Sequence, residues 1–382
     1  MRLTAALIAR DEERFLPGCL ESLEDVVDEV VVVDTGSKDA TPTIARQAGA
    51  RVLHHAWRDD FAAARNVALD AARGDWILYI DADERVRGGR PDSLSKQLED
   101  RSIVGLTVRF RPATGFTLYN EHRLFRRHPD IRFRGVIHET HLPDLYRLAG
   151  RDGLHIEHSE LALDHLGYDG DISHKHPRNL PLLEARVRDD PDHVFSWWHL
   201  GQTLEGLGRS EDAATAWRQG LEASRRDGGG TGIMILPYLA LLDRTAKLER
   251  RLDESLWREA DERFPRHPRL LWLRALARID DEEWAAAAND LEILVATDLE
   301  QPVAAQLATE ERLFLTEAPL RLAHCLFRLE RYAEASTLYR CLEDEQGMEE
   351  VTVWRRLAEI RARRHATETP AETGSAESST HG

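Results

Sequence analysis

The sequence is poor in cysteine, with three in 382 residues and no Cys-x-x-Cys pair. This excludes a disulfide framework and a thiolate zinc site, and it is typical of a protein of the reducing cytoplasm. Long apolar runs are absent too, because no stretch approaches the roughly 20 residues that a transmembrane helix needs. Residues 1–9 carry one basic residue and a short apolar run before an acidic cluster, a pattern that indicates a strand and not a signal peptide. We therefore expect a cytoplasmic protein without a membrane span.

An excess of basic residues is also lacking, since the formal net charge is -17. Polyphosphate chains bind to basic surfaces, so the charge argues against a nucleic-acid partner. It argues equally against attachment to an anionic membrane by charge alone. The content of 42% hydrophobic and 31% charged residues is that of an ordinary globular protein, and the length suggests two or three folding units.

Glycine-rich phosphate loops are missing as well. Ala9-Arg10-Asp11-Glu12-Glu13 follows the first predicted strand, where a dinucleotide-binding fold needs glycines, and no Gly-x-x-x-x-Gly-Lys segment occurs. A nucleotide bound by this chain must therefore have its phosphates neutralised by another device.

The first hundred residues alternate short strands and helices. Continuous β-branched runs such as Val30–Val33 are typical of strands covered on both faces. Single helices between strands predict parallel pairing with right-handed crossovers, and hence an α/β domain. The predicted strands are 3–9, 30–33, 51–54 and 76–80, and the predicted helices are 13–23, 41–48 and 61–72.

Residues 103–163 are rich in Arg, Phe, His and Gly. We predict strands at 103–110 and 133–137, which extend the sheet and build the acceptor side of a cleft.

Beyond residue 171 the pattern is helical and contains a repeat. A small residue is followed twelve and sixteen positions later by another small residue and a large one, and the position nine after the first residue is Ser, Trp or Tyr. The three sets are Gly201, Ala213 and Trp217 with Ser210; Ala275, Ala287 and Leu291 with Trp284; and Ala323, Ala335 and Tyr339 with Tyr332. Small residues let antiparallel helices pack closely, so we predict tetratricopeptide-like repeats with insertions, and a plain helical bundle is the alternative.

Acidic residues follow three of the predicted strands: Asp11 and Glu12, then Asp34, then Asp81 and Asp83. Ligands gather at the carboxyl ends of parallel strands, so these carboxylates are expected to face one crevice. Such clustering is unfavourable unless a cation or hydrogen-bond donors fill the space. A divalent ion at Asp81-Ala82-Asp83 would be such a cation. The base or ribose of a nucleotide would supply hydrogen-bond donors to Asp11 and Asp34.

Asp81 and Glu84 have an alternative interpretation. A Ser, Thr, Asp or Asn followed three residues later by Glu is the pattern of a helix capping box, so the tripeptide could simply begin a helix.

Three segments resemble family 2 glycosyltransferases of the GT-A fold. They are Val30-Val-Val-Val-Asp34-Thr-Gly-Ser37, Asp59-Asp-Phe-Ala-Ala-Ala-Arg65-Asn66 and Gly74-Asp-Trp-Ile-Leu-Tyr-Ile-Asp81-Ala-Asp83-Glu84, in the order and spacing of that family. The resemblance covers residues 1 to about 170, and more narrowly it is to bacterial members that carry tetratricopeptide repeats after the catalytic domain. One departure is Arg10-Asp11-Glu12, which stands where the family usually has Asn-Glu.

The resemblance implies a nucleotide-sugar donor, usually UDP-linked, together with Mg²⁺ or Mn²⁺ and inversion at the anomeric carbon. It implies that Arg65 and Asn66 support the donor site, against the alternative of a surface arginine and a local cap. Glu139 resembles the acid that activates the acceptor, against a solvated loop glutamate. His165 resembles the late histidine of the metal shell, with His138 as the other candidate and a structural role as the default for any of the 17 histidines.

We therefore predict a GT-A domain at 1–170, a tetratricopeptide-like domain at 171–365 and a disordered tail at 366–382. The predicted activity is metal-assisted, inverting transfer from a UDP-sugar to a peptide, protein or glycan acceptor. The predicted metal ligands are Asp83, Asp81 and His165, and the predicted donor contacts are Asp11, Glu12, Asp34, Arg65, Asn66 and Asp81. Two alternatives are a non-catalytic scaffold and a nucleotidyltransferase, which would need a basic glycine-rich loop after the first strand. The repeats could bind a partner protein or a second copy of the chain.

Overall fold

The computed structural model describes residues 1–113, 115–166, 176–227, 232–249, 252–299 and 308–368. It divides into two compact units, residues 1–267 with 298–310, and residues 268–297 with 311–382. The predicted boundary at 170 lies outside the described residues, and so do residues 369–382 of the tail predicted at 366–382. The first three residues of that predicted tail are instead the last residues of a helix, so the prediction of disorder is wrong there. No helix in the described residues is long and apolar enough to cross a membrane.

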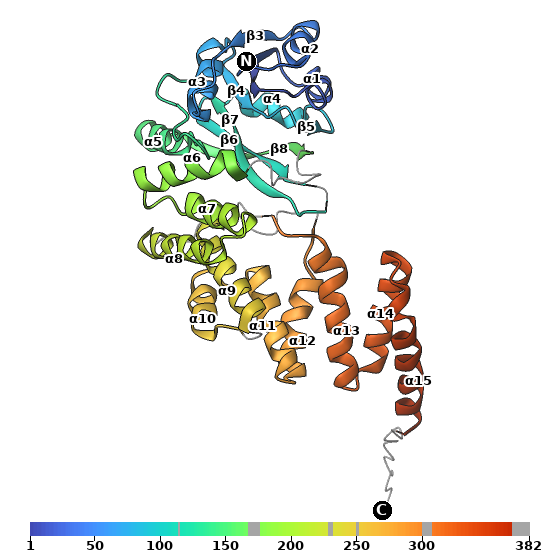
Figure 1. Ribbon diagram of the computed structural model, residues 1–382. Helices are drawn as coiled ribbons and strands as arrows, with labels where there is room; N and C mark the ends of the chain where they lie inside the picture. The colour runs from blue at the N-terminus through green and yellow to red at the C-terminus, as the bar shows by residue number, and fades with distance from the viewer. Residues whose placement is uncertain (114, 167–175, 228–231, 250–251, 300–307, 369–382) are drawn as a thin grey trace, which may run out of the picture. The chain divides into compact units, whose positions relative to one another are not determined.

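An eight-stranded sheet in the order β3-β2-β1-β4-β7-β6-β8-β5 organises the first unit (Figure 1). The strands are β1 (Leu3–Ala9), β2 (Glu29–Asp34), β3 (Arg51–His54), β4 (Trp76–Tyr79), β5 (Glu84–Arg87), β6 (Ile103–Arg111), β7 (Tyr119–Arg126) and β8 (His155–His165). The first four pair in parallel, as the sequence predicts. The strand β7 pairs antiparallel with β4 and β6, so residues after 103 do extend the sheet.

Helices cover both faces of this sheet. They are α1 (Leu16–Leu23), α2 (Thr41–Gln47), α3 (Phe61–Ala71), α4 (Asp92–Glu99) and α5 (Leu142–Asp152). Alternate strand residues face opposite layers: Leu7 and Trp76 join the core under α1, α2 and α4, whereas Ala6 and Ile77 join the core under α3 and α5. This two-sided burial explains why the parallel strands are almost wholly apolar.

The predicted strand at 133–137 is wrong. Within that segment only Arg134 pairs, through an isolated bridge to Thr140. Gly135 has φ +101° and His138 has φ +51°, and left-handed residues interrupt an extended ladder. The segment is instead a loop that lies against α3 and carries Glu139.

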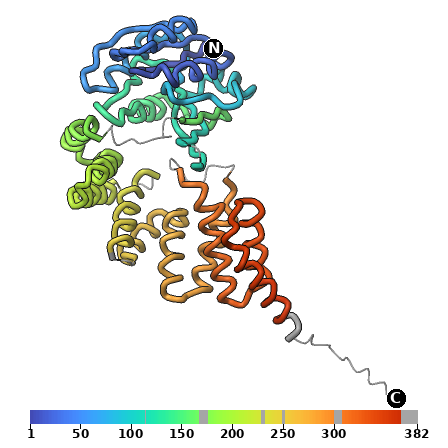
Figure 2. Tube along the Cα trace, turned by 45° about the vertical axis from the view of Figure 1, so that its right-hand side comes forward, coloured from blue at the N-terminus to red at the C-terminus, as the bar shows by residue number. Residues whose placement is uncertain are grey.

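The remaining helices occur mainly in antiparallel pairs. In the first unit they are α6 (His176–Asp189), α7 (Val194–Gly206), α8 (Ser210–Asp227), α9 (Leu236–Glu249) and α10 (Glu254–Arg263). In the second they are α11 (Pro268–Asp280), α12 (Trp284–Val295), α13 (Ala318–Arg328), α14 (Tyr332–Gln346) and α15 (Thr352–Glu368), which stack in sequence order (Figure 2).

The predicted small-and-large offsets describe three of these pairs. Ser210, Trp284 and Tyr332 are the first residues of α8, α12 and α14. A Cβ atom added to Gly201 would lie 2.1 Å from Nε1 of Trp217, so the tryptophan fills the space that the missing side chain leaves. The interval between the first two sets contains a further pair, α9 and α10, that the offsets do not detect.

Candidate active site

The carboxyl ends of β1, β2 and β4 lie at one edge of the sheet, because these three strands are parallel and adjacent. Asp34 is the last residue of β2, and Asp81 and Asp83 come two and four residues after β4 ends. Asp11 comes two residues after β1 and has φ +56°. The sheet topology thus brings the predicted acids to neighbouring loops.

Ser37 links the loops that carry Asp11 and Asp34. The Asp11 N–H donates to Ser37 Oγ at 3.0 Å, and the Ser37 N–H donates to Asp34 Oδ1 at 3.1 Å. Asp11 Oδ1 accepts from the Lys38 N–H at 2.7 Å, and the Glu12 N–H donates to Thr41 Oγ1 at 2.7 Å. Carboxylates and hydroxyls therefore order the turn after β1, where other nucleotide-binding folds use glycines.

Asp34 is buried and ionised. Burial opposes its ionisation, but hydrogen bonds from Ser37 and His54 outweigh that penalty and lower the pKa of Asp34 below its usual value. His54 Nδ1 lies 3.0 Å from Asp34 Oδ2. Ser37 and His54 therefore hold the Asp34 carboxylate, a hydrogen-bond acceptor, at this edge of the sheet.

Arg65 joins two of the predicted site acids. Its Nη2–H donates to Asp81 Oδ1 at 2.8 Å, and its Nε–H donates to Glu139 Oε1 at 2.5 Å. The side chains of Arg65 and Glu139 are each only 10% exposed. The alternatives of a surface arginine and a solvated loop glutamate are therefore wrong. Burial raises the pKa of Asp81, but the charges of Arg65 and Arg123 outweigh it and lower the pKa overall.

Aromatic rings enclose the Arg65 guanidinium. Its Cζ lies 5.2 Å from the ring centre of Tyr79 and 5.5 Å from that of Phe133. Among the described residues, its Nη1 is buried without a hydrogen-bond partner. An arginine with an unsatisfied buried donor retains the capacity to bind an anionic group.

Asn66 holds the loop that carries Glu139. Its Nδ2–H donates to the Phe133 carbonyl at 3.0 Å, and its Oδ1 accepts from the Phe133 N–H at 3.0 Å. The Phe61 N–H donates to the Val136 carbonyl at 3.0 Å. Helix α3 therefore supplies Arg65 to the site and fixes the loop opposite it.

Asp83 and His165 form a second pair at this edge. Asp83 Oδ2 lies 3.2 Å from His165 Nε2, and His165 Nδ1 lies 2.9 Å from the Pro112 carbonyl. A carbonyl only accepts, so Nδ1 carries hydrogen and Nε2 is the atom turned to the carboxylate. Burial lowers the pKa of His165, but the Asp83 carboxylate outweighs it and raises the pKa overall.

Asp83 and His165 have the ligand types that bind divalent metal ions. An imidazole whose Nδ1–H is held by a carbonyl presents Nε2 as a ligand, and a carboxylate oxygen beside it suits Mn²⁺ or Mg²⁺. The predicted third ligand, Asp81, is instead bound to Arg65. No group of three or more His, Cys, Asp or Glu within the described ranges is placed to hold a metal. The ring of His138 packs on Phe195 and His199 of α7, at centroid distances of 4.9 and 4.1 Å.

Glu84 forms no helix cap. It begins strand β5, so the capping-box interpretation of Asp81 and Glu84 is wrong. The Glu84 carboxylate accepts from the Asp81 N–H at 2.9 Å and from Nη2 of Arg123 at 2.7 Å. Both side chains of this ion pair are almost wholly buried, and Glu84 binds the backbone of the Asp81 loop.

Residues 4–154 match the family model described as Glycosyl transferase family 2. This part of the chain is a family 2 glycosyltransferase domain. The chain is 37% identical over 254 residues to a TPR repeat-containing protein of Synechococcus elongatus, covering 64% of this chain and 62% of that protein. It is 26% identical over 227 residues to the prophage-derived glycosyltransferase SunS of Bacillus subtilis, covering 55% of this chain and 51% of that one. The chain thus spans between half and two thirds of the length of these two relatives.

Solved structures include a glucosyl-3-phosphoglycerate synthase of Mycobacterium tuberculosis in complex with Mn²⁺, UDP-glucose and phosphoglyceric acid. It is 20% identical, has a TM-score of 0.35, and covers 49% of this chain and 79% of that one. So slight a likeness supports no conclusion about this chain.

Several residues of this candidate site are not predicted from the sequence. They are Tyr79 and Phe133 around Arg65, Glu84 with Arg123, and the α7 residues Phe195 and His199 against His138. The paired burial of Glu84 and Arg123 leaves no signal in a single sequence, because the two lie on separate strands. The positive φ of His138 likewise leaves no signal in a single sequence.

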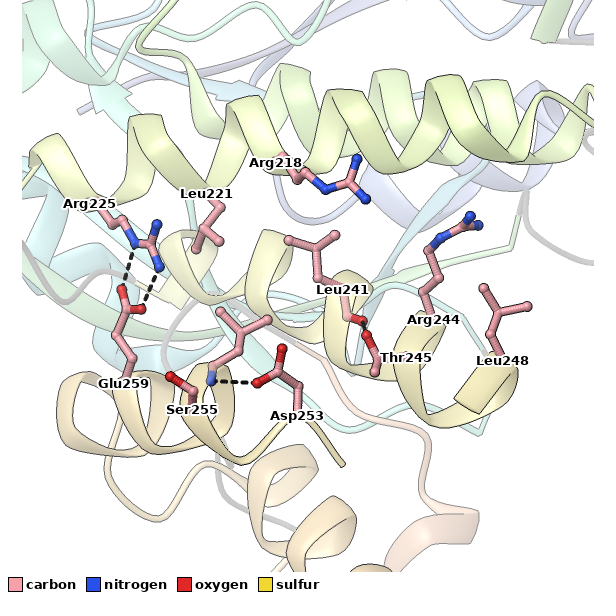
Figure 3. A pocket seen from close by; sticks show the side chains of 11 residues that line it. Arg218, Leu221, Arg225, Leu241, Arg244, Thr245, Leu248, Asp253, Ser255 and Glu259 are labelled. Carbon is pink, nitrogen blue, oxygen red and sulfur yellow. Dashed lines mark hydrogen bonds and ion pairs between the residues drawn. The ribbon is translucent and has the colours of Figure 1, made fainter. Parts of the chain in front are cut away.

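The described pockets lie away from this site. One of about 510 Å³ lies among α8, α9 and α10 of the repeats (Figure 3). Three arginines and two carboxylates line it, and Arg225 is bound there to Glu259. Another of about 470 Å³ lies beside His122, Tyr146 and His158. Neither is lined by a predicted site residue.

Proposed function

We propose that this chain is a metal-assisted, inverting glycosyltransferase that moves a sugar from a UDP-sugar to a peptide, protein or glycan acceptor. The proposal rests chiefly on one observation, the bridge from Asp81 through Arg65 to Glu139. In it, a buried guanidinium holds two carboxylates at the strand ends of a family 2 glycosyltransferase domain.

Glu139 is the proposed general base. Arg65 binds Oε1, whereas Oε2 forms no hydrogen bond within the described part of the chain. A carboxylate fixed by one oxygen and open at the other can accept a proton from an acceptor hydroxyl. As that proton reaches Oε2, the acceptor oxygen bonds to the anomeric carbon and the bond from this carbon to the diphosphate breaks. Attack from the face opposite the leaving group inverts the configuration.

Asp83 and His165 would hold Mn²⁺ or Mg²⁺ with the help of donor oxygens, and the ion when bound supplies positive charge against the departing diphosphate. Arg65 offers its unpaired Nη1 to the donor as a further cationic contact. Asp34 and Asp11 lie at the neighbouring strand ends, where they would accept hydrogen bonds from the ribose or the base. Glu12 belongs to the same turn, and Asn66 acts by holding the loop that carries the base.

The test measures release of UDP from a panel of UDP-sugars, with Mn²⁺ and with a chelator in excess, for the full chain. Asp83→Asn and chelation should each reduce turnover at least about 100-fold, because removal of one charge-stabilising group typically costs that much. Glu139→Gln should abolish transfer and still bind UDP in calorimetry.

The exposed acids Asp25 and Glu24 provide matched controls, since Asp25→Asn and Glu24→Gln make the same chemical changes away from the strand ends. Turnover that survives both chelation and Asp83→Asn would contradict the metal-assisted mechanism. Normal transfer by Glu139→Gln would exclude it as the base. A chain that binds neither UDP nor any UDP-sugar would be a scaffold and not an enzyme.

A further inference from the structure

The last described helix, α15, exposes an apolar row. Val353, Leu357 and Ile360 are 73%, 36% and 50% exposed and recur at i, i+4 and i+7. This spacing places them on one face of a helix. On the opposite side α15 packs along α14, and Ala358 is fully buried. The helix thus has one side packed on α14 and, on the other side, an apolar row that no described residue covers.

Arginines surround this row. Arg356, Arg361 and Arg363 are exposed on the same side of α15, and Arg361 and Arg363 form no ion pair or hydrogen bond within the described ranges. We call Val353, Leu357, Ile360, Arg356, Arg361 and Arg363 the α15 face. These positive charges lie in a chain whose formal net charge is -17.

Carboxylates nearby do not neutralise the α15 face. Between 353 and 365 the only acid is Glu359, which is bound to Arg355 at 2.9 Å and to Arg340 at 3.2 Å. Glu343 on α14 is bound to Arg355 at 2.5 Å. Arg355 therefore binds both neighbouring carboxylates, and the charge of Arg356 also acts on Glu343. Arg361 and Arg363 keep no acidic partner within the described ranges.

We propose that the α15 face is a docking surface for an acidic amphipathic helix of a partner protein. Such a helix would set aliphatic side chains on Val353, Leu357 and Ile360 and carboxylates beside Arg361 and Arg363. Anchors at i, i+4 and i+7 are the pattern by which helices pair, and arginine–carboxylate contacts fix orientation as well as adding attraction.

Other occupants match the α15 face less well. Two copies of α15 packed face to face would bring their arginines together, and like charges at an interface disfavour it. Residues 369–382 contain two acids and no Leu, Ile, Val, Met or aromatic residue, so they cannot cover the apolar row. A membrane would meet only three aliphatic side chains spread over about 10 Å of helix, and stable attachment usually takes a second anchoring signal.

The proposal is independent of sugar transfer, and binding tests it directly. The probe is a fluorescein-labelled 20-residue peptide designed as a helix, with leucines along one face and glutamates on both flanks. We expect the full chain to bind it, and binding should weaken as salt rises. The double variant Arg361→Glu/Arg363→Glu should weaken binding at least tenfold, and so should Leu357→Ser/Ile360→Ser. A peptide with lysines in place of the glutamates should not bind.

The matched control is Lys247→Glu/Arg258→Glu, which changes the net charge equally at exposed residues of α9 and α10. It should bind the acidic peptide as the unaltered chain does. Circular dichroism of each variant checks that the helices remain folded.

Three outcomes would overturn the proposal. The first is equal binding by the α15 variants and the control. The second is sedimentation of the chain with phosphatidylglycerol vesicles, lost in the α15 variants, without peptide binding, which would make the α15 face a membrane contact. The third is a dimer in light scattering that Leu357→Ser/Ile360→Ser dissolves, which would make it a self-association surface.

Discussion

Each unit of the chain contains a largely buried cluster of three charged side chains, and the two clusters have opposite compositions. At the strand ends, one arginine, Arg65, lies between two acids, Asp81 and Glu139. In the repeats of the second unit, one acid, Asp290, lies between two arginines, Arg274 and Arg278, at 2.7 and 2.6 Å. Burial of such clusters costs free energy that their mutual attraction only partly offsets.

The difference lies in what each cluster leaves unpaired. Both carboxylate oxygens of Asp290 accept hydrogen bonds, and its two arginine partners are about a quarter exposed. This cluster therefore joins α11 to α12 while both arginines stay partly hydrated. Arg65 is more deeply buried and keeps an unpaired nitrogen at the strand ends. We infer that the first cluster is built for a ligand and the second for packing.

The largest effect is expected from Arg65→Met. It should leave the buried carboxylate of Glu139 and the partly exposed carboxylate of Asp81 without their cation, and it should cost about 3–5 kcal/mol of the free energy of unfolding. Sugar transfer should fall at least about 100-fold. Urea unfolding and UDP release measure the two effects, and activity close to that of the unaltered chain would end the inference that Arg65 serves the site.

A sharper form combines Arg65→Met with Asp81→Asn and Glu139→Gln. Removal of all three charges together should restore most of the lost stability, since neutral groups of similar volume carry no uncompensated charge. Transfer should stay abolished. If the triple variant is as unstable as the single one, the site cluster is needed for folding, and the comparison fails.

A smaller effect is expected from Asp290→Asn. The amide keeps the shape but loses the charge, so the second unit should lose about 1–3 kcal/mol of its free energy of unfolding. The kcat/KM for sugar transfer should stay within twofold. A large loss of activity in a chain that remains folded would show that this cluster also serves the reaction.

The last prediction concerns stability in acid. Burial, with the charge of His193, lowers the pKa of His199 to about 3, and burial beside His199 lowers that of His138 well below its usual value. Both rings are neutral when folded, whereas the unfolded chain protonates them below about pH 6.5. The unfolded state therefore binds more protons below about pH 6.5. For each of these histidines, the free energy of unfolding of the first unit should fall by up to about 1.4 kcal/mol for every pH unit below that pH.

Unfolding in urea at pH 7.5, 6.5 and 5.5 measures this loss. His199→Phe keeps an aromatic ring against His138 and removes one titrating group, so its stability should depend less on pH. An unchanged dependence would show that other groups set the acid sensitivity of the unit.

The parallel half of the sheet is predictable from the sequence almost residue by residue. The strands β1 and β3 have the predicted bounds, β2 is one residue longer at each end and β4 ends one residue earlier, because strands buried on both faces are continuous apolar runs. The strands β7 and β8 are not predicted, because they carry charged residues throughout, as in Asn120-Glu121-His122-Arg123. Their pairing is set by distant partners.

The site shows the same division. Acids at strand ends follow from topology, so Asp34, Asp81 and Asp83 are placed by reasoning from the sequence. The partners that hold them come from elsewhere in the chain, as Arg123 does for Glu84. Asp81 illustrates the limit, since sequence alone cannot tell that its carboxylate is bound to Arg65 rather than turned toward Asp83.

The pairing of β5 with β8 has a consequence for insertions and deletions. Glu84 stands opposite His165 in this antiparallel ladder, which places Asp83 beside the imidazole. A residue added between β7 and β8 leaves the register of β5 with β8 unchanged, so the Asp83–His165 pair would survive it. A residue added within β8 would shift the register and turn His165 to the other face of the sheet. Variation in the length of homologous chains is therefore expected in the loops and not in this strand.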